Sequence, residues 1–262
     1  MDIEVYLEEF TADWRLAGRS AATAANYCHS VRTLVATTSD AKEVTLAGVK
    51  VWLAESVSAE TARYRARAVR AFGRWALTHE GPQWTWWASV PLQATPAKPQ
   101  PTVSLDEYRA AVASASQLRD RCVIELLWST GMRVSELARV RVEHVDVRGG
   151  YISVPRTKTG RPRVVPLTDA ALRACRRQIN ARTTGSLLGM SSHAIQLLLR
   201  RLGAPTPHAW RRGWAVHALR NGVSEASVRA AAGWSSGAMV ARYTSAVSGE
   251  LAIDEFRRIP SA

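Results

Sequence analysis

The sequence predicts a mainly α-helical protein with one small β-sheet, divided into two domains. Apolar residues recur at helical spacing along most of the chain, whereas two short segments, 151–154 and 163–167, have the pattern of strands. A proline-rich segment, 91–102, is typical of an extended linker. We therefore expect an all-helical domain over 1–90 and an α+β domain with a C-terminal tail over 103–262.

The first domain is expected to contain about four helices and no strand. Ser20 and Ser58 have the side chains of N-caps for the second and fourth helices, and Gly81-Pro82 ends the fourth. The tryptophan-rich segment 83–87 favours packing in a core or between domains over stacking on bases. The helices are expected at 2–17, after Ser20, at 46–55 and at 59–79.

Four arginines form a stripe along the helix expected at 59–79. Their spacing of i, i+4, i+7 and i+11 puts them on one face. A solvated basic face and a DNA-binding face explain this pattern about equally well. Because four like charges repel unless an anion neutralises them, we slightly favour DNA. The four residues are Arg63, Arg67, Arg70 and Arg74.

The charge of the chain favours a polyanionic partner. There are 35 lysines and arginines against 22 acidic residues, which gives a formal net charge of +13 and a pI near 10.6. Codon bias explains why arginine is used rather than lysine, but it does not explain the excess of positive charge. Nucleic acid is the expected partner, because arginine binds phosphate through two parallel hydrogen bonds.

The cysteines and the apolar segments indicate a cytoplasmic protein. Cys28, Cys122 and Cys175 are far apart and form no C-x-x-C pair, which argues against a disulfide scaffold and a zinc site. The first ten residues lack the features of a signal peptide, and no apolar run has the length of a membrane span. We expect no contact with a membrane.

The second domain is expected to begin with a capped helix. Ser104 and Glu107 form the sequence pattern of a capping box, and Gly131 ends a helix expected at 119–130. A short helix is expected at 133–140, before the two strands. Further helices are expected at 169–182, 191–202, 207–220, 224–232 and 236–246.

Several residues of the second domain suit the binding of a phosphodiester. Arg133 follows a glycine turn at a helix start, where backbone N–H groups also favour phosphate, and Glu136 could orient it. Arg211 lies three residues after His208, so the two share a helix face. Lys158, in the turn between the strands, could protonate a leaving oxygen. Each alone is more often a surface or structural residue.

The last part of the chain adds a hydrogen-bond donor and a nucleophile. The indole of Trp234 can donate one N–H to a phosphate oxygen. Tyr243 has a phenol with an ordinary pKa near 10, so it needs cations or a base to attack phosphorus. His208 could be that base or a phosphate ligand. Taken alone, such a tryptophan or tyrosine is usually part of a core.

These motifs together resemble the tyrosine recombinases, the lambda-integrase family. S-T-G-M-R-V-S-E-L, T-K-T-G-R-P-R-V-V-P-L, H-A-W-R, A-G-W and R-Y occur in the family's order over 129–244. F-G-R-W-A, near the end of the first domain, more weakly resembles the family's core-binding domain. The resemblance implies an active site of Arg133, Lys158, His208, Arg211 and Trp234, with Tyr243 as nucleophile and Glu136 in support. We assign Arg161 and the four helix arginines to DNA contact.

The resemblance also implies the reaction and the partners. Tyrosine would attack a phosphate of double-stranded DNA to give a 3′-phosphotyrosyl bond, without ATP, metal or other cofactor. A homotetramer would act on two duplexes, and the tail segment from Leu251 to Ile259 would either dock on a neighbouring protomer or pack on its own domain. Trp234 stands where phage integrases more often have histidine, and Arg212 replaces a frequent second histidine. The chain starts with core-binding helices, so we expect no arm-binding domain.

Other functions are less consistent with the sequence. Gly233 to Gly237 match G-x-S-x-G, but no strand precedes them and no histidine follows, which excludes a hydrolase elbow. A type IB topoisomerase would share the chemistry without exchanging strands. A regulator with a decayed site would not fill all six expected positions. Phage integration is our first expectation, and resolution of chromosome or plasmid dimers by an Xer-like enzyme is the second.

Overall fold

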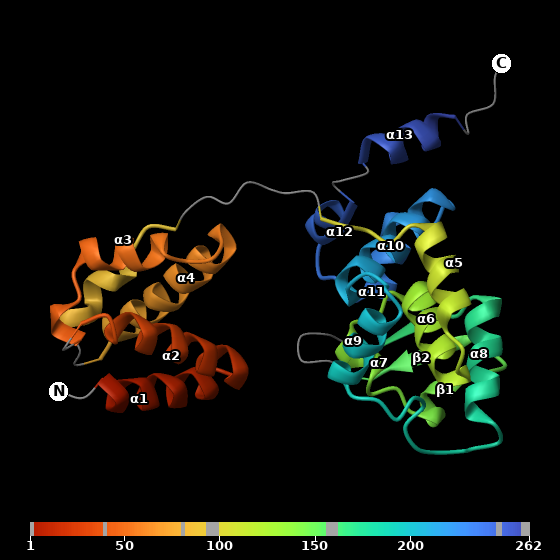
Figure 1. The fold of residues 1–262 in the computed structure, drawn as a ribbon, viewed down its shortest axis with the longest axis horizontal. Coiled ribbons are helices and arrows are strands. Elements are labelled where there is room, and N and C mark those ends of the chain that lie inside the picture. Colours follow the sequence, from red (N-terminus) through yellow and green to blue (C-terminus); the bar gives the residue numbers. More distant parts are fainter. Residues whose placement is uncertain are drawn as a thin grey trace. The chain divides into compact units, whose positions relative to one another are not determined.

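A computed structural model describes residues 3–38, 41–79, 82–92, 100–155, 162–244 and 248–257. The chain forms two compact units, Met1–Ala97 and Lys98–Ala262 (Figure 1). The part of the predicted linker at 93–99 lies outside the described residues. None of the helices within the described ranges is long and apolar enough to cross a membrane.

The described residues of the N-terminal unit form helices and 3₁₀ turns joined by short connections, without a strand. As expected, the hydroxyl of Ser20 accepts a hydrogen bond from the backbone N–H of Thr23, and that of Ser58 from Thr61. Each of these helices therefore starts where a side chain satisfies one of its free N–H groups. The helices are α1 (Ile3–Leu16), α2 (Ala21–Val35), α3 (Leu46–Ala54) and α4 (Ala59–Ala76), with 3₁₀ turns η1 (Ala41–Glu43) and η2 (Pro82–Ser89).

Aromatic rings dominate the core of the N-terminal unit. Helix α4 contacts α2, α3 and η2, and its buried face carries Val69, Phe72 and Ala76. Trp84 and Trp87 of η2 are 1% and 0% exposed and pack against Phe72. The prediction that the tryptophan-rich segment contributes to a core is therefore confirmed.

The C-terminal unit is built around α6 (Leu118–Thr130), which contacts α5, α7, α8, α10 and β3. In the order of the chain its other elements are α5 (Leu105–Ser114), α7 (Val134–Leu137), η3 (Val142–His144), β1 (Val145–Asp146), β2 (Tyr151–Val154), β3 (Arg163–Pro166), α8 (Asp169–Ile179), α9 (Ser192–Arg201), α10 (Pro207–Arg220), α11 (Glu225–Ala232), α12 (Gly237–Thr244) and α13 (Ser248–Phe256). The capping box of Ser104 and Glu107 is present. The fold is thus mainly α-helical with a small sheet, as the sequence predicts.

The sheet is antiparallel with the strand order β1-β2-β3. Ile152 pairs with Val145 on one side and with Val165 on the other. Ile152 and Val165 are both 0% exposed, so this face of the sheet packs into the core. Lys158 and Arg161 lie in the segment 156–161 between β2 and β3, outside the described residues.

Three predicted helix boundaries and one strand differ from the structure. The helix expected at 133–140 covers only Val134–Leu137, because Val140 and Val142 instead exchange backbone hydrogen bonds with Leu187 and Gly185. Helix α4 ends at Ala76 rather than 79, and α8 ends at Ile179, where Asn180 adopts a left-handed φ of 42°. Strand β1 is too short for a pattern of alternation to predict it.

Candidate active site

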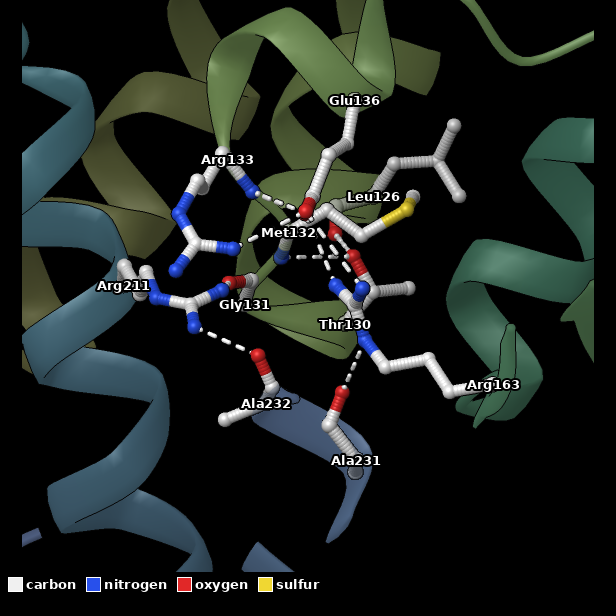
Figure 2. Close-up of polar contacts among 10 residues, drawn as sticks. All are labelled: Leu126, Thr130, Gly131, Met132, Arg133, Glu136, Arg163, Arg211, Ala231 and Ala232. Carbon is white, nitrogen blue, oxygen red and sulfur yellow. Dashed lines mark hydrogen bonds and ion pairs between the residues drawn. The ribbon is translucent and has the colours of Figure 1, made fainter. Parts of the chain in front are cut away.

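The site begins at the turn that ends α6. Gly131 has a φ of 55°, and its N–H bonds to the carbonyl of Leu127, which closes the last turn of the helix as the sequence predicts. The preceding Thr130 donates its hydroxyl to Leu126 and accepts the backbone N–H of Met132. The chain therefore leaves the core at a fixed angle, and Arg133 emerges two residues later (Figure 2).

Glu136 holds Arg133 in place. The carboxylate accepts the backbone N–H of Arg133 at 2.9 Å and its Nη1 at 3.0 Å. The Arg133 side chain remains 37% exposed, whereas the Glu136 side chain is 5% exposed. One end of the pair is thus anchored in the protein, and the guanidinium stays accessible to a ligand.

Arg163 of β3 is the second partner of Glu136. Its Nη2 and Nη1 donate to the two carboxylate oxygens at 2.7 and 3.3 Å, and its Nε donates to the carbonyl of Ala231 at 2.8 Å. Burial alone would raise the pKa of Glu136, but the hydrogen bonds from Arg163 and from the Arg133 backbone, with both positive charges, lower it below its ordinary value. Glu136 is therefore a carboxylate at neutral pH.

Arg211 of α10 lies on the other side of the same turn. Arg211 is only 1% exposed. Its Nη1 and Nη2 donate to the carbonyls of Gly131 and Ala232, both at 2.6 Å. Because these acceptors are neutral, they fix the guanidinium without cancelling its charge. Arg133 and Arg211, 78 positions apart in sequence, are therefore brought to one turn, and Figure 2 shows both side chains at this turn.

Trp234 lies next to Arg211. The guanidinium carbon of Arg211 is 5.0 Å from the centre of the indole ring, and Trp234 is 6% exposed in a small cluster with Trp214 and Val228. Gly233, in the left-handed conformation at φ 66°, ends α11 and turns the chain toward α12. Helix α12 carries Tyr243, whose side chain lies outside the part of the molecule that the structure describes.

His208 lies in the first turn of α10, one turn before Arg211. The residue is exposed, although the surrounding protein removes part of its hydration. This loss of hydration, followed by the charges of Arg212, Arg211 and Arg133, lowers the pKa of His208. The imidazole is therefore mostly neutral at pH 7, and it can accept a proton.

The arginine stripe of α4 lies beside a cavity in the N-terminal unit. Arg67, Arg70 and Arg74 line this cavity of about 580 Å³ together with Arg19. Arg63, one turn earlier on α4, is half-buried and is not part of the lining. The other lining residues include the aromatic side chains of Phe10, Trp14, Tyr27, Trp75 and His79. Three of the four arginines of the stripe thus share one concave surface.

Arg163 is a site residue that the sequence reasoning missed. The strand at 163–167 was expected, but no role was given to its first residue. Alternation places Arg163 on the same face as Val165, and Val165 is in the core. A buried arginine needs a carboxylate or carbonyl partner, so the strand pattern contained a signal for an internal ion pair.

Comparison with known proteins places the C-terminal unit in a family. Residues 103–249 match the model of the phage integrase family. The chain is 30% identical to the tyrosine recombinase XerC of Mycobacterium bovis over 281 residues, which cover 92% of this chain and 94% of the relative. It is 29% identical to the tyrosine recombinase XerA of Pyrococcus horikoshii over 134 residues, 45% of this chain and 47% of the relative.

The fold has a close counterpart among solved structures. The structure of a lambda integrase dimer bound to a COC′ core site matches with a TM-score of 0.77 at 19% identity, over 95% of this chain and 78% of the other. The resemblance stated from the motifs, the α+β fold and the expected class of enzyme are therefore confirmed. The chain belongs to the phage integrase family and is a tyrosine recombinase, a site-specific enzyme of DNA strand cleavage and transesterification.

Proposed function

We propose that the chain cuts and rejoins duplex DNA through a covalent bond between Tyr243 and a DNA 3′-phosphate. The observation that carries the proposal is the convergence of Arg133 and Arg211 at the Gly131 turn. Two fixed guanidiniums can neutralise the non-bridging oxygens of one phosphate and stabilise the extra charge of the transition state. In this proposal Trp234, which packs against Arg211, donates its indole N–H to the same phosphate.

The remaining roles follow from the chemistry of the step. The phenol oxygen of Tyr243 bonds to phosphorus, the bond from phosphorus to the 5′ oxygen breaks, and His208 takes the phenol proton while Lys158 protonates the leaving oxygen. The lowered pKa of His208 supports its role as acceptor. The 5′-hydroxyl of a partner strand then attacks the phosphotyrosyl bond and releases Tyr243. The phosphoester energy is conserved, so the exchange needs no cofactor.

The N-terminal unit binds DNA through the stripe on α4. Arg67 and Arg74 are exposed and make no ion pair within the described ranges, although they line a cavity that contains a single carboxylate, Asp13. That carboxylate already accepts a hydrogen bond from Nε1 of Trp75 and lies 2.9 Å from Nε2 of His79. The uncompensated positive charge supports contact with the phosphate backbone. Arg63 and Arg70 extend this contact, and Arg161, from the segment between β2 and β3, makes its own contact with DNA.

A homotetramer acts on two duplexes, and α13 docks on a neighbouring protomer. Helix α13 exposes Ile253 and Phe256, which are 53% and 74% exposed, and this supports a partner for its apolar residues. Its Glu250 pairs with Arg220 of α10.

Deletion of 248–262 is expected to abolish the synaptic complex on a native gel while leaving binding of single sites. A complex that survives the deletion contradicts the docking.

Two biological roles fit this chemistry. Integration of a mobile or viral genome is consistent with the phage integrase model, and the near full-length similarity to XerC supports resolution of chromosome or plasmid dimers. The two roles differ in whether the recombining sites belong to one replicon or two. The DNA on which the chain acts in its host distinguishes them.

Strand exchange between two duplexes tests the proposal. Sites are selected from a pool of random duplexes by binding, and two labelled duplexes carrying a selected site are incubated with the protein. Recombinant duplexes of new length are expected. Relaxation of supercoiled DNA without recombinants would indicate a topoisomerase-like enzyme, and binding without any cleavage would indicate a regulator.

A further inference from the structure

Arg163 connects two parts of the active site that are far apart in sequence. Its Nη atoms bond to Glu136 of α7, and its Nε bonds to the carbonyl of Ala231 at the end of α11. Figure 2 shows the guanidinium between these two acceptors. One planar group thereby joins β3 to the helix that carries Glu136 and to the turn that precedes Trp234.

On the α7 side, Arg163 controls how Glu136 holds Arg133. The Arg163 side chain is 7% exposed and that of Glu136 is 5% exposed, so the pair is shielded from water. With Arg163 in place, each carboxylate oxygen has one bond to Arg163 and one to Arg133. Without Arg163, the buried carboxylate would turn toward its remaining cation, and the geometry of Arg133 would change.

On the α11 side, Arg163 supports the turn that follows the helix. A Cβ atom added to Gly233 would lie 3.2 Å from both Cδ and Nη1 of Arg163, so the turn packs directly on the side chain. Ala231 accepts from Arg163, and the next residue, Ala232, accepts from Arg211. Neighbouring carbonyls of one helix end therefore bind two different arginines, and only Gly233 separates this end from Trp234.

We propose that Arg163 is the positioning residue that sets Arg133 relative to the α11–α12 turn carrying Trp234 and leading to Tyr243. This inference rests on the proposed function of the site. Arg163 acts through Glu136 and the Ala231 carbonyl, and it does not itself contact the phosphate. Three N–H groups in one plane make both connections at once, which a lysine ammonium cannot do in the same geometry.

The test measures the rate of covalent adduct formation on nicked duplex DNA at saturating DNA. Arg163→Met is expected to slow the adduct by about 10²-fold, because small misplacement of catalytic groups has effects of this size, while DNA affinity is unchanged. Arg163→Lys is expected to recover part of the rate, since the charge beside Glu136 returns. Arg201→Met is the matched control, because it removes an ion pair to the buried Asp120 elsewhere in the same unit.

A double substitution separates positioning from general stability. Arg163→Met should slow the adduct less in a Glu136→Gln background than in the wild-type chain, because the Glu136 connection is already lost there and only the Ala231 connection remains to be broken. A wild-type rate in Arg163→Met, an equal loss in Arg201→Met, or full loss on top of Glu136→Gln would overturn the positioning role. If the unsubstituted chain forms no adduct, the proposed function fails, and the positioning role fails with it.

Discussion

Replacement of Gly131 by alanine tests how the α6 turn is built. Gly131 has a φ of 55°, and a Cβ atom there would lie 2.2 and 2.3 Å from Cε3 and Cδ2 of Trp214. Trp214 is 7% exposed, and its rigid ring cannot rotate away without displacing α10. Because α10 also carries His208 and Arg211, the substitution should disturb both stability and the active site.

The expected destabilisation has two parts. A left-handed conformation costs an L-residue roughly 1–2 kcal/mol, and overpacking of a filled core costs roughly 1–3 kcal/mol more. Gly203→Ala is the matched control, because Gly203 has a φ of 63° and nothing lies within 4 Å of an added Cβ atom. Gly203→Ala is destabilised only by the left-handed conformation, whereas Gly131→Ala is also destabilised by overpacking. Gly131→Ala should therefore be less stable than Gly203→Ala by about 2 kcal/mol.

Thermal unfolding of the two variants measures the difference. For a unit of this size, about 2 kcal/mol corresponds to a Tm lower by roughly 4–8 °C. Adduct formation on nicked DNA should also fall in Gly131→Ala and remain in Gly203→Ala. Equal Tm values in the two variants would refute the reasoning, because they would mean that the Trp214 ring does not oppose a side chain at this position.

Two further predictions concern charge. Burial opposes ionisation of Glu136, but its hydrogen bonds to Arg163 and to the Arg133 backbone lower its pKa overall. The ionised carboxylate therefore stabilises the folded chain fully above the pKa of Glu136 in the unfolded chain, about 4.3. This stabilisation is lost as the pH falls through the lower pKa of Glu136 in the folded chain. The stability advantage of wild type over Glu136→Gln, measured by denaturant unfolding from pH 7 to pH 3, should therefore shrink only below about pH 4; a constant difference contradicts the ion pair. Arg67→Ala or Arg74→Ala should each reduce the slope of log K against log salt for DNA binding by about 1, whereas Arg32→Ala, at an arginine paired with Glu4, should not.

Local sequence signals predicted most elements of the fold. The hydroxyl of Ser20, the capping box of Ser104 and the glycine after α6 each act on neighbouring backbone groups, so residues close in sequence were sufficient to locate those helix ends. Long-range contacts were not predictable in this way. The helix expected at 133–140 is cut short because Val140 bonds to Leu187, 47 positions away.

The candidate site shows the same division. Arg133, Arg211 and Trp234 were expected from their motifs, and the structure brings them together at the Gly131 turn. Arg163 was missed, because its importance comes from Glu136 and Ala231, which lie 27 and 68 positions away. No periodicity within β3 identifies those acceptors. Motifs thus indicated the groups that we propose as phosphate ligands, whereas packing determines the groups that hold them.

The central claim is that Tyr243 forms the covalent bond to DNA. The direct measurement uses a nicked duplex in which cleavage releases a short fragment, so the covalent product accumulates and migrates slowly on a denaturing gel. Wild type and Tyr151→Phe, a control at a β2 tyrosine outside the site, are predicted to give the adduct. Tyr243→Phe is predicted to bind the duplex with unchanged affinity and to give none. An adduct in Tyr243→Phe would contradict the account.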